Sequence, residues 1–312
     1  MRRNIIKQLI QGVIIGFAFI SGMGGGTVAV LMGIYDDLVQ GVADFNKNAK
    51  ASIKLLWPWV VGAVLGVGAL IYPIQLAIEH FPIPTTALIV GLTIGGLREL
   101  TKITNKQVNL KNFIFAFIAL VFATGIGIIS WFSASSGTLS SLGITEVLIA
   151  LGIGFIESAA IVAPGISGTQ FLLAIGYFNA VLVLITGLFT GGNILTNLIL
   201  ILFIGIGFIV GVIVVSKIMK FFLTKFRIPT YFILLGFIVG SIFACFLNGD
   251  IKSAYVIFNQ WDATSTWTII SSIILFAGGF ILSYFLLKYI ENQKNESNTK
   301  IKNEENNNGL GN

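Results

Sequence analysis

The residues of this chain that could do chemistry are two runs of glycine and hydroxyl side chains and one carboxylate, all within long apolar sequence. The first run is SGMGGGT at 21–27, and the second is PGISGT at 164–169. Glycine lets backbone N–H groups approach a ligand closely, and the start of a helix carries partial positive charge. Because each run precedes an apolar segment, the two predict helix starts that together would bind an anion such as phosphate. The predicted binding residues are Ser21, Gly22, Gly24, Gly25, Gly26, Thr27, Pro164, Gly165, Ser167, Gly168 and Thr169.

The Pro-Gly break at 164–165 interrupts a long apolar segment. A helix that crosses lipid satisfies its backbone internally, so a break frees N–H groups that need another partner. Such a backbone is stable at membrane depth only where it is buried in protein or lines a polar cavity. Close helix packing, the alternative role for glycine, does not require a broken helix. We therefore favour binding for the break, and packing for Gly62, Gly66, Gly68, Gly205, Gly207 and Gly211.

Glu157 is the only acidic residue well inside an apolar segment. A charge at membrane depth is costly, so we expect this carboxyl group to be protonated, paired or in contact with a wet cavity. Glu157 is the candidate for proton coupling, and the alternative is a carboxylate at the membrane surface near the start of its segment. Arg98 either forms a snorkelling pair with Glu99 at the end of a span or binds an anionic head group.

The composition is that of a membrane protein. The chain is 55% hydrophobic and 10% charged, with a mean hydropathy of +0.93. About a quarter of the residues of a soluble domain are charged. Repeated apolar runs near 20 residues therefore predict an all-α polytopic membrane protein.

Several classes of function are disfavoured by the residues present. The chain has one cysteine, Cys245, so no intramolecular disulfide can form. The first glycine run lacks the lysine that follows a nucleotide-binding P-loop. His80 has no neighbouring ligand residues, so we expect no metal and no cofactor. The basic residues lie in short loops between apolar segments, which argues against nucleic acid. No nucleophile and base are paired, and we predict that the protein is not an enzyme.

The chain repeats itself at an offset of about 143 residues. Gly22, Gly25 and Gly33 correspond to Gly165, Gly168 and Gly176. A second match, now at 145 residues, pairs IPTTALIVG at 83–91 with IPTYFILLG at 228–236. We therefore predict a membrane repeat at 1–135, an inverted second repeat at 144–290, and a disordered cytoplasmic tail at 291–312 that is too polar to fold.

Each repeat is predicted to hold two short apolar arms around its glycine run, followed by three apolar spans. The arms cover about 5–20, 27–41, 147–163 and 168–186; the spans cover about 55–78, 84–97, 112–132, 198–216, 229–247 and 267–287. If each pair of arms enters and leaves on one side, all Lys and Arg residues except Lys252 lie on the cytoplasmic side. Both termini are then cytoplasmic, and the two repeats have inverted topology.

The arms could be re-entrant hairpins or two short full crossings, which give the same topology. At 1.5 Å per residue the arm 27–41 reaches about 22 Å, which is less than the membrane core of about 30 Å. We favour two inverted-topology repeats, each a re-entrant helical hairpin plus three transmembrane helices.

The residues APGISGTQFLLAIGYFNAVL at 163–182, together with GGGTVAVLMGIYDDLV at 24–39, resemble the bacterial polyprenyl-phosphate transporter family. The resemblance extends to about residue 290. The family's first run is Pro-Gly-Val-Ser-Gly-Gly-Thr, usually with an aspartate just before it. Here Ser21 replaces the proline, Gly24 replaces the serine, and Ala18 stands near the position of the aspartate. The second motif is intact, so we expect an asymmetric two-part site.

The resemblance implies a carrier that returns undecaprenyl phosphate from the outer to the cytoplasmic leaflet of the bacterial plasma membrane, for reuse in envelope synthesis. The glycine runs would bind the phosphate while the tail stays in lipid, and a proton associated with Glu157 would ease passage. Two alternatives remain: a channel or secondary transporter for a small anion, and a non-transporting membrane scaffold. The identity of the lipid rests on the resemblance alone.

Overall fold

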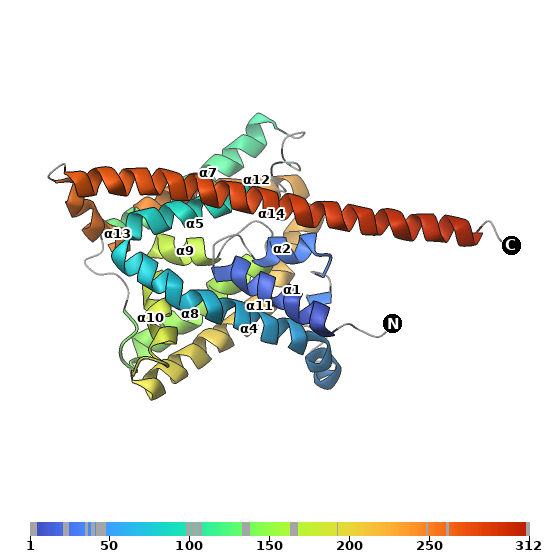
Figure 1. The fold of residues 1–312 in the computed structure, drawn as a ribbon, viewed down its shortest axis with the longest axis horizontal. Coiled ribbons are helices and arrows are strands. Elements are labelled where there is room, and N and C mark those ends of the chain that lie inside the picture. Colours follow the sequence, from blue (N-terminus) through green and yellow to red (C-terminus); the bar gives the residue numbers. More distant parts are fainter. Residues whose placement is uncertain are drawn as a thin grey trace.

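The computed structural model describes residues 5–20, 25–34, 37–38, 41, 48–97, 101, 104, 108–132, 138–162, 168–191, 193–247, 249–259 and 262–309. Within these ranges every regular element is a helix (Figure 1). Five helices are long and apolar enough to cross a membrane: α4 (Ala49–His80), α7 (Leu110–Phe132), α11 (Ile194–Lys225), α12 (Arg227–Phe246) and the part of α14 at Ala263–Tyr289. The prediction of an all-α polytopic membrane protein is confirmed.

The remaining helices are shorter. They are α1 (Ile5–Ile20), α2 (Gly25–Leu31), α5 (Pro82–Gly96), α8 (Ile144–Val162), α9 (Gly168–Ile175), α10 (Phe178–Thr186), α13 (Gly249–Lys252) and the 3₁₀ helix η3 (Ser253–Phe258). The predicted span at 84–97 is α5, whose 15 residues reach about 22 Å at 1.5 Å per residue. It begins with prolines at positions where a helix has no N–H partner to lose.

The second arm of each predicted hairpin ends at a glycine with left-handed backbone. Gly33 has φ 70°, and Gly176 has φ 77°. At Gly176 the N–H groups of Gly176 and Tyr177 donate to the carbonyls of Leu173 and Leu172, which is the Schellman pattern of a helix end. The predicted arm at 168–186 is therefore not continuous: it divides into α9 and α10.

Four pairs of helices cross at glycines, where the absence of a side chain brings the two backbones together. Within each half of the chain, α1 packs on α4 and α8 packs on α11. A Cβ atom at Gly62 would overlap the Leu9 carbonyl oxygen, and one at Gly207 would overlap the Leu151 carbonyl oxygen. The expected packing role is confirmed for Gly62, Gly66, Gly207 and Gly211. It is wrong for Gly68 and Gly205, where an added Cβ would meet nothing within 4 Å.

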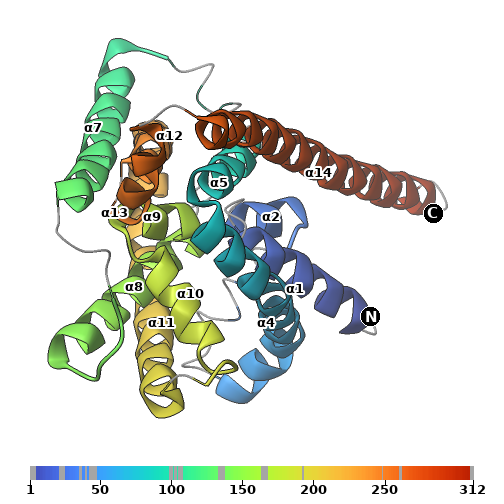
Figure 2. The same ribbon diagram turned by 60° about the vertical axis from the view of Figure 1, so that its left-hand side comes forward.

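The other two crossings join the two halves of the chain. The helix α5 packs along α14, and α7 packs along α12 (Figure 2). A Cβ at Gly91 would overlap the Phe276 carbonyl oxygen, and one at Gly236 would overlap the Ala116 carbonyl oxygen. The two halves are therefore interleaved in one helical body, because each contributes a helix to a pair completed by the other.

The largest buried cluster surrounds α9 and α10. Leu172, Leu173, Phe178 and Leu182 each have at most 2% of their surface exposed. They pack with buried residues of α4, α5, α8, α11 and α12. The second glycine run thus leads directly into this buried cluster.

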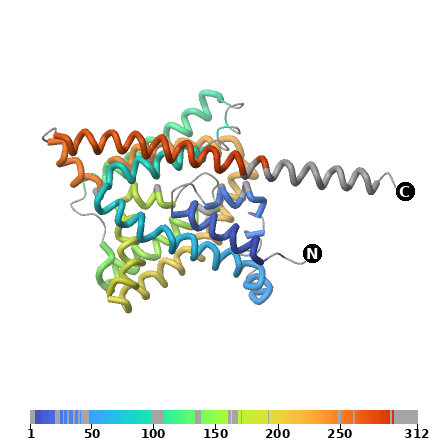
Figure 3. The backbone as a smooth tube through the Cα atoms, viewed as in Figure 1, coloured from blue at the N-terminus to red at the C-terminus, as the bar shows by residue number. Residues whose placement is uncertain are grey.

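The helix α1 begins on the side of the molecule towards which α14 runs (Figure 3). Asp262 caps the start of α14, because its carboxylate accepts the Ser265 N–H at 2.8 Å. This bond lowers the pKa of Asp262. The helix α14 spans Ala263–Gly309. The disorder of the tail at 291–312 stays a prediction.

Candidate functional site

A hydrogen bond joins the last residue of the second glycine run to a residue two positions before the first run, 150 positions away in the sequence. The Thr169 hydroxyl donates to the Phe19 carbonyl oxygen at 2.6 Å. Phe19 lies in the last turn of α1, just before the first run, and Thr169 is the second residue of α9, just after the break in the second run. The last carbonyls of a helix lack intrahelical partners, so this bond satisfies one of them. The segments that flank the two runs are therefore in direct contact.

The described part of the first run starts α2. Gly25 and Gly26 are buried, and α2 packs against α1 and α8. A Cβ on Gly25 would meet Cγ2 and the carbonyl oxygen of Ile15, each at 3.3 Å. Thr27 lies in the first turn of α2, and its side chain is outside the described atoms. Ser21, Gly22 and Gly24 lie outside the described residues.

The described part of the second run starts α9. Gly168 and Thr169 are both buried, and only 2% of the Thr169 surface is exposed. The Thr169 hydroxyl was predicted to bind the anion, but it donates its proton to Phe19. Pro164, Gly165 and Ser167 lie outside the described residues, as does Arg98.

Glu157 lies on α8 with its carboxyl group directed at the start of α9. Only 7% of its surface is exposed. A Cβ on Gly168 would overlap Oε2 and would lie 2.6 Å from Cδ and 2.9 Å from Oε1 of Glu157. Oε2 is buried and accepts no hydrogen bond within the described part of the chain. Gly168 therefore provides the space that this carboxyl group occupies.

Ser158, the neighbour of Glu157 on α8, contacts α11 at Gly211, and the sequence analysis missed it. Its side chain is fully buried, and its hydroxyl donates to the Phe155 carbonyl at 2.5 Å. The hydroxyl fills the space that a side chain on Gly211 would need. A serine in an apolar helix does not reveal this contact, because the spacing gives no information on which neighbour it meets.

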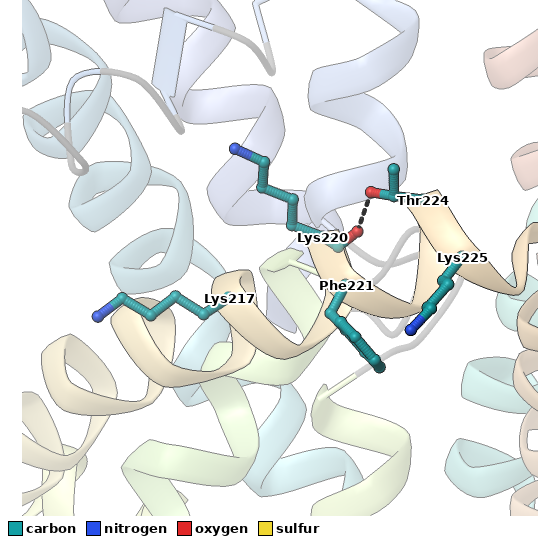
Figure 4. Close-up of a pocket in the computed structure, with 5 residues that line it drawn as sticks. All are labelled: Lys217, Lys220, Phe221, Thr224 and Lys225. Carbon is teal, nitrogen blue, oxygen red and sulfur yellow. Dashed lines mark hydrogen bonds between the residues drawn. The ribbon is translucent and has the colours of Figure 1, made fainter.

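A basic groove of about 500 Å³ lies at the C-terminal end of α11 (Figure 4). It is lined by Lys217, Lys220, Phe221, Thr224 and Lys225. The Lys225 ammonium group is 5.4 Å from the centre of the Phe221 ring, a cation–π contact. Gly211 is the point where α11 meets Ser158, next to Glu157. The first residue of the groove, Lys217, lies six residues further along α11, which is about 9 Å along the helix axis. We therefore treat the groove as separate from the site at the start of α9.

The helices α2 and α9 both begin at buried glycines, and the start of α9 lies beside the buried carboxyl group of Glu157. Among the described residues no three His, Cys, Asp or Glu side chains lie close enough to hold a metal ion. Short helices that start inside a helical membrane bundle are typical of many secondary transporters.

Comparisons with known proteins show which family the chain belongs to. Residues 15–263 match the family described as undecaprenyl phosphate translocase-like, and the chain belongs to this family. It is 28% identical to the polyprenyl-phosphate transporter of Staphylococcus aureus over 250 residues, which are 78% of this chain and 85% of that protein. It is 26% identical to the polyprenyl-phosphate transporter of Vibrio cholerae over 262 residues, 77% of each chain. No solved structure matches the chain. The protein is a multi-pass membrane transporter and not an enzyme.

Proposed function

We propose that this protein carries undecaprenyl phosphate from the outer to the cytoplasmic leaflet of the bacterial plasma membrane. The observation that carries the proposal is the bond from Thr169 to Phe19, which joins the segments flanking the two glycine runs. The phosphate is held by the glycine-rich breaks at 21–27 and 164–169, and the polyprenyl tail stays in lipid. The family and the names of the two relatives support this choice of substrate.

The proposed architecture is two inverted-topology repeats, each a re-entrant hairpin plus three membrane helices. The glycine crossings support it, because Gly207 and Gly236 each lie 145 positions after Gly62 and Gly91 (207 − 62 and 236 − 91) and make equivalent contacts. The hairpins are α1–α2 and α8–α9. With seven and eight residues, α2 and α9 reach only about 10–12 Å at 1.5 Å per residue, well short of a crossing.

Both termini are proposed to be cytoplasmic. The groove at the end of α11 then faces the cytoplasmic leaflet, whose anionic lipids attract lysine. Lys252, the exception to the charge rule, lies on the opposite side. Its ammonium group donates to the Trp131 carbonyl at 3.0 Å and lies 5.6 Å from the centre of the Trp131 ring. These contacts give this outer lysine partners at the end of α7.

Glu157 is proposed to carry the coupled proton. Its burial and the lack of a described donor for Oε2 support the proposal, because a charged carboxylate in apolar surroundings is costly. Transport by Glu157→Gln should lose its dependence on a pH gradient. If this variant transports as well as the wild type at every pH, Glu157 does not carry the proton.

The proposed function is tested in proteoliposomes that contain undecaprenyl phosphate. An added phosphatase reaches only the lipid in the outer leaflet. Hydrolysis of more lipid than the outer leaflet initially holds therefore reports movement between the leaflets. We expect protein-dependent movement that a pH gradient accelerates, and none in liposomes without protein. Absence of movement under any gradient would refute the carrier. Ion conductance without lipid movement would indicate an anion channel. Full function of a variant with both Gly165→Leu and Ser167→Leu would indicate a scaffold.

A further inference from the structure

We propose that the carboxylate of Glu157 occupies the position at the start of α9 that the substrate phosphate takes, so that the two anions exclude each other. The inference rests on the proposed function and adds a regulatory role to the same site. Gly168 is the first residue of α9, and the space above its Cα contains the carboxyl group of Glu157.

A buried anion beside Gly168 would contact the first N–H groups of α9. The first N–H groups of a helix have no intrahelical acceptor and carry partial positive charge. Oε2 of Glu157 is buried, and no donor for it is found on the described residues. Oε2 therefore fills the space at Gly168 without a hydrogen bond from the described start of α9, and this space is closed to a second anion while the carboxyl group is there.

The identity of residue 168 supports this arrangement. Any side chain at this position would collide with the carboxyl group, and a flexible Glu157 would have to leave. The neighbouring Thr169 has its hydroxyl committed to Phe19, so it does not compete for the carboxyl group. Glycine at 168 therefore keeps the backbone at the start of α9 open to whichever anion is present.

The consequence is an exchange of anions at one position. While the carboxylate is in place, the start of α9 is closed to other anions, including inorganic phosphate. The substrate phosphate binds only when the carboxyl group is neutral or has turned away, because two negative charges at contact distance repel. Glu157 thus reduces affinity for the phosphate and in return keeps small anions out of an empty carrier.

The test is the binding of farnesyl phosphate to purified protein in detergent, with farnesol as the uncharged probe. We expect Glu157→Gln to bind farnesyl phosphate at least tenfold more tightly than the wild type and to bind farnesol equally. Millimolar inorganic phosphate should compete in the variant and not in the wild type. The matched control is Glu146→Gln, which removes a carboxylate from the first turn of the same helix, where Glu146 accepts a bond from Ser141.

The outcomes separate the inference from the proposed function. Equal or weaker binding of farnesyl phosphate by Glu157→Gln overturns the inference, while the carrier function stands if the wild type still prefers farnesyl phosphate over farnesol. If neither protein prefers the phosphate, both proposals fail. Glu157→Asp provides a second measurement if the glutamine variant does not fold. Its shorter side chain withdraws the charge from Gly168, so its affinity should lie between those of the wild type and Glu157→Gln.

Discussion

Replacing Thr169 with valine removes the hydroxyl that joins the two halves of the site and leaves a side chain of similar shape. The Phe19 carbonyl then loses its partner at 2.6 Å. Because Thr169 is 2% exposed, water has little access to replace the hydroxyl. A buried polar group left without a partner costs about 1–3 kcal/mol, which exceeds the net worth of about 1 kcal/mol for an ordinary hydrogen bond. We expect the free energy of unfolding of the variant to fall by about 1–3 kcal/mol, and its midpoint of thermal unfolding to fall with it.

The effect on transport should exceed the effect on stability. The bond sets the distance between the ends of the two glycine runs, and both must contact one phosphate. We expect Thr169→Val to slow movement of undecaprenyl phosphate in proteoliposomes by at least tenfold. Thr169→Ser keeps the hydroxyl and should retain most of the rate.

The matched control is Thr186→Val, at another buried threonine. The Thr186 hydroxyl donates to the Leu182 carbonyl of its own helix at 2.9 Å. That carbonyl keeps its backbone partner after the substitution, so the control should change transport little. If Thr169→Val transports at the rate of Thr186→Val, or if Thr169→Ser fails as badly as Thr169→Val, the hydroxyl bridge does not position the site.

Three further predictions concern stability, measured as the midpoint of thermal unfolding in detergent. Gly91→Ala should destabilise the protein by about 1–3 kcal/mol, because the added Cβ would overlap the Phe276 carbonyl oxygen. Gly68→Ala, where the added Cβ meets nothing within 4 Å, should stabilise it by about 0.5–1 kcal/mol. Equal effects of the two substitutions would contradict the glycine crossing of α5 and α14. Gly176→Ala, at φ 77°, should cost at least about 1 kcal/mol, and a neutral result would show that the left-handed helix end is not required. Lys252→Gln should cost less than about 1 kcal/mol because the side chain is exposed, so a larger loss would show that its contact with Trp131 is a main support of this end.

Much of the helical architecture could be predicted from the sequence. Hydropathy located five of the six expected spans as long helices, and the sixth, expected at 84–97, is the shorter helix α5. These features depend on the composition of short segments, and each segment carries its own signal. The division of the arm at 168–186 was missed, because glycine is compatible with both helical and left-handed backbone and only the observed φ separates them.

The residues of the candidate site stay a prediction from the sequence, and the contacts among those described came only with the structure. The glycine runs and Glu157 were found because such residues are unusual in apolar sequence. The partner of Thr169 was not, because nothing near residue 169 indicates a carbonyl 150 positions earlier. The carboxyl group of Glu157 likewise meets Gly168 only once α8 and α9 are folded against each other.

The sequence by itself indicated that this chain enters a membrane, predicted that its second half repeats its first, and placed Glu157 inside an apolar segment. These properties are sums over neighbouring residues or matches between letters, and they do not depend on packing. Tertiary structure alone decided that α5 pairs with α14 and α7 with α12, and which glycines lie at those crossings. Gly62 and Gly68 occupy the same apolar segment, but only Gly62 faces another helix. Helix association in lipid depends on how two surfaces fit, and that fit exists only between segments distant in the chain.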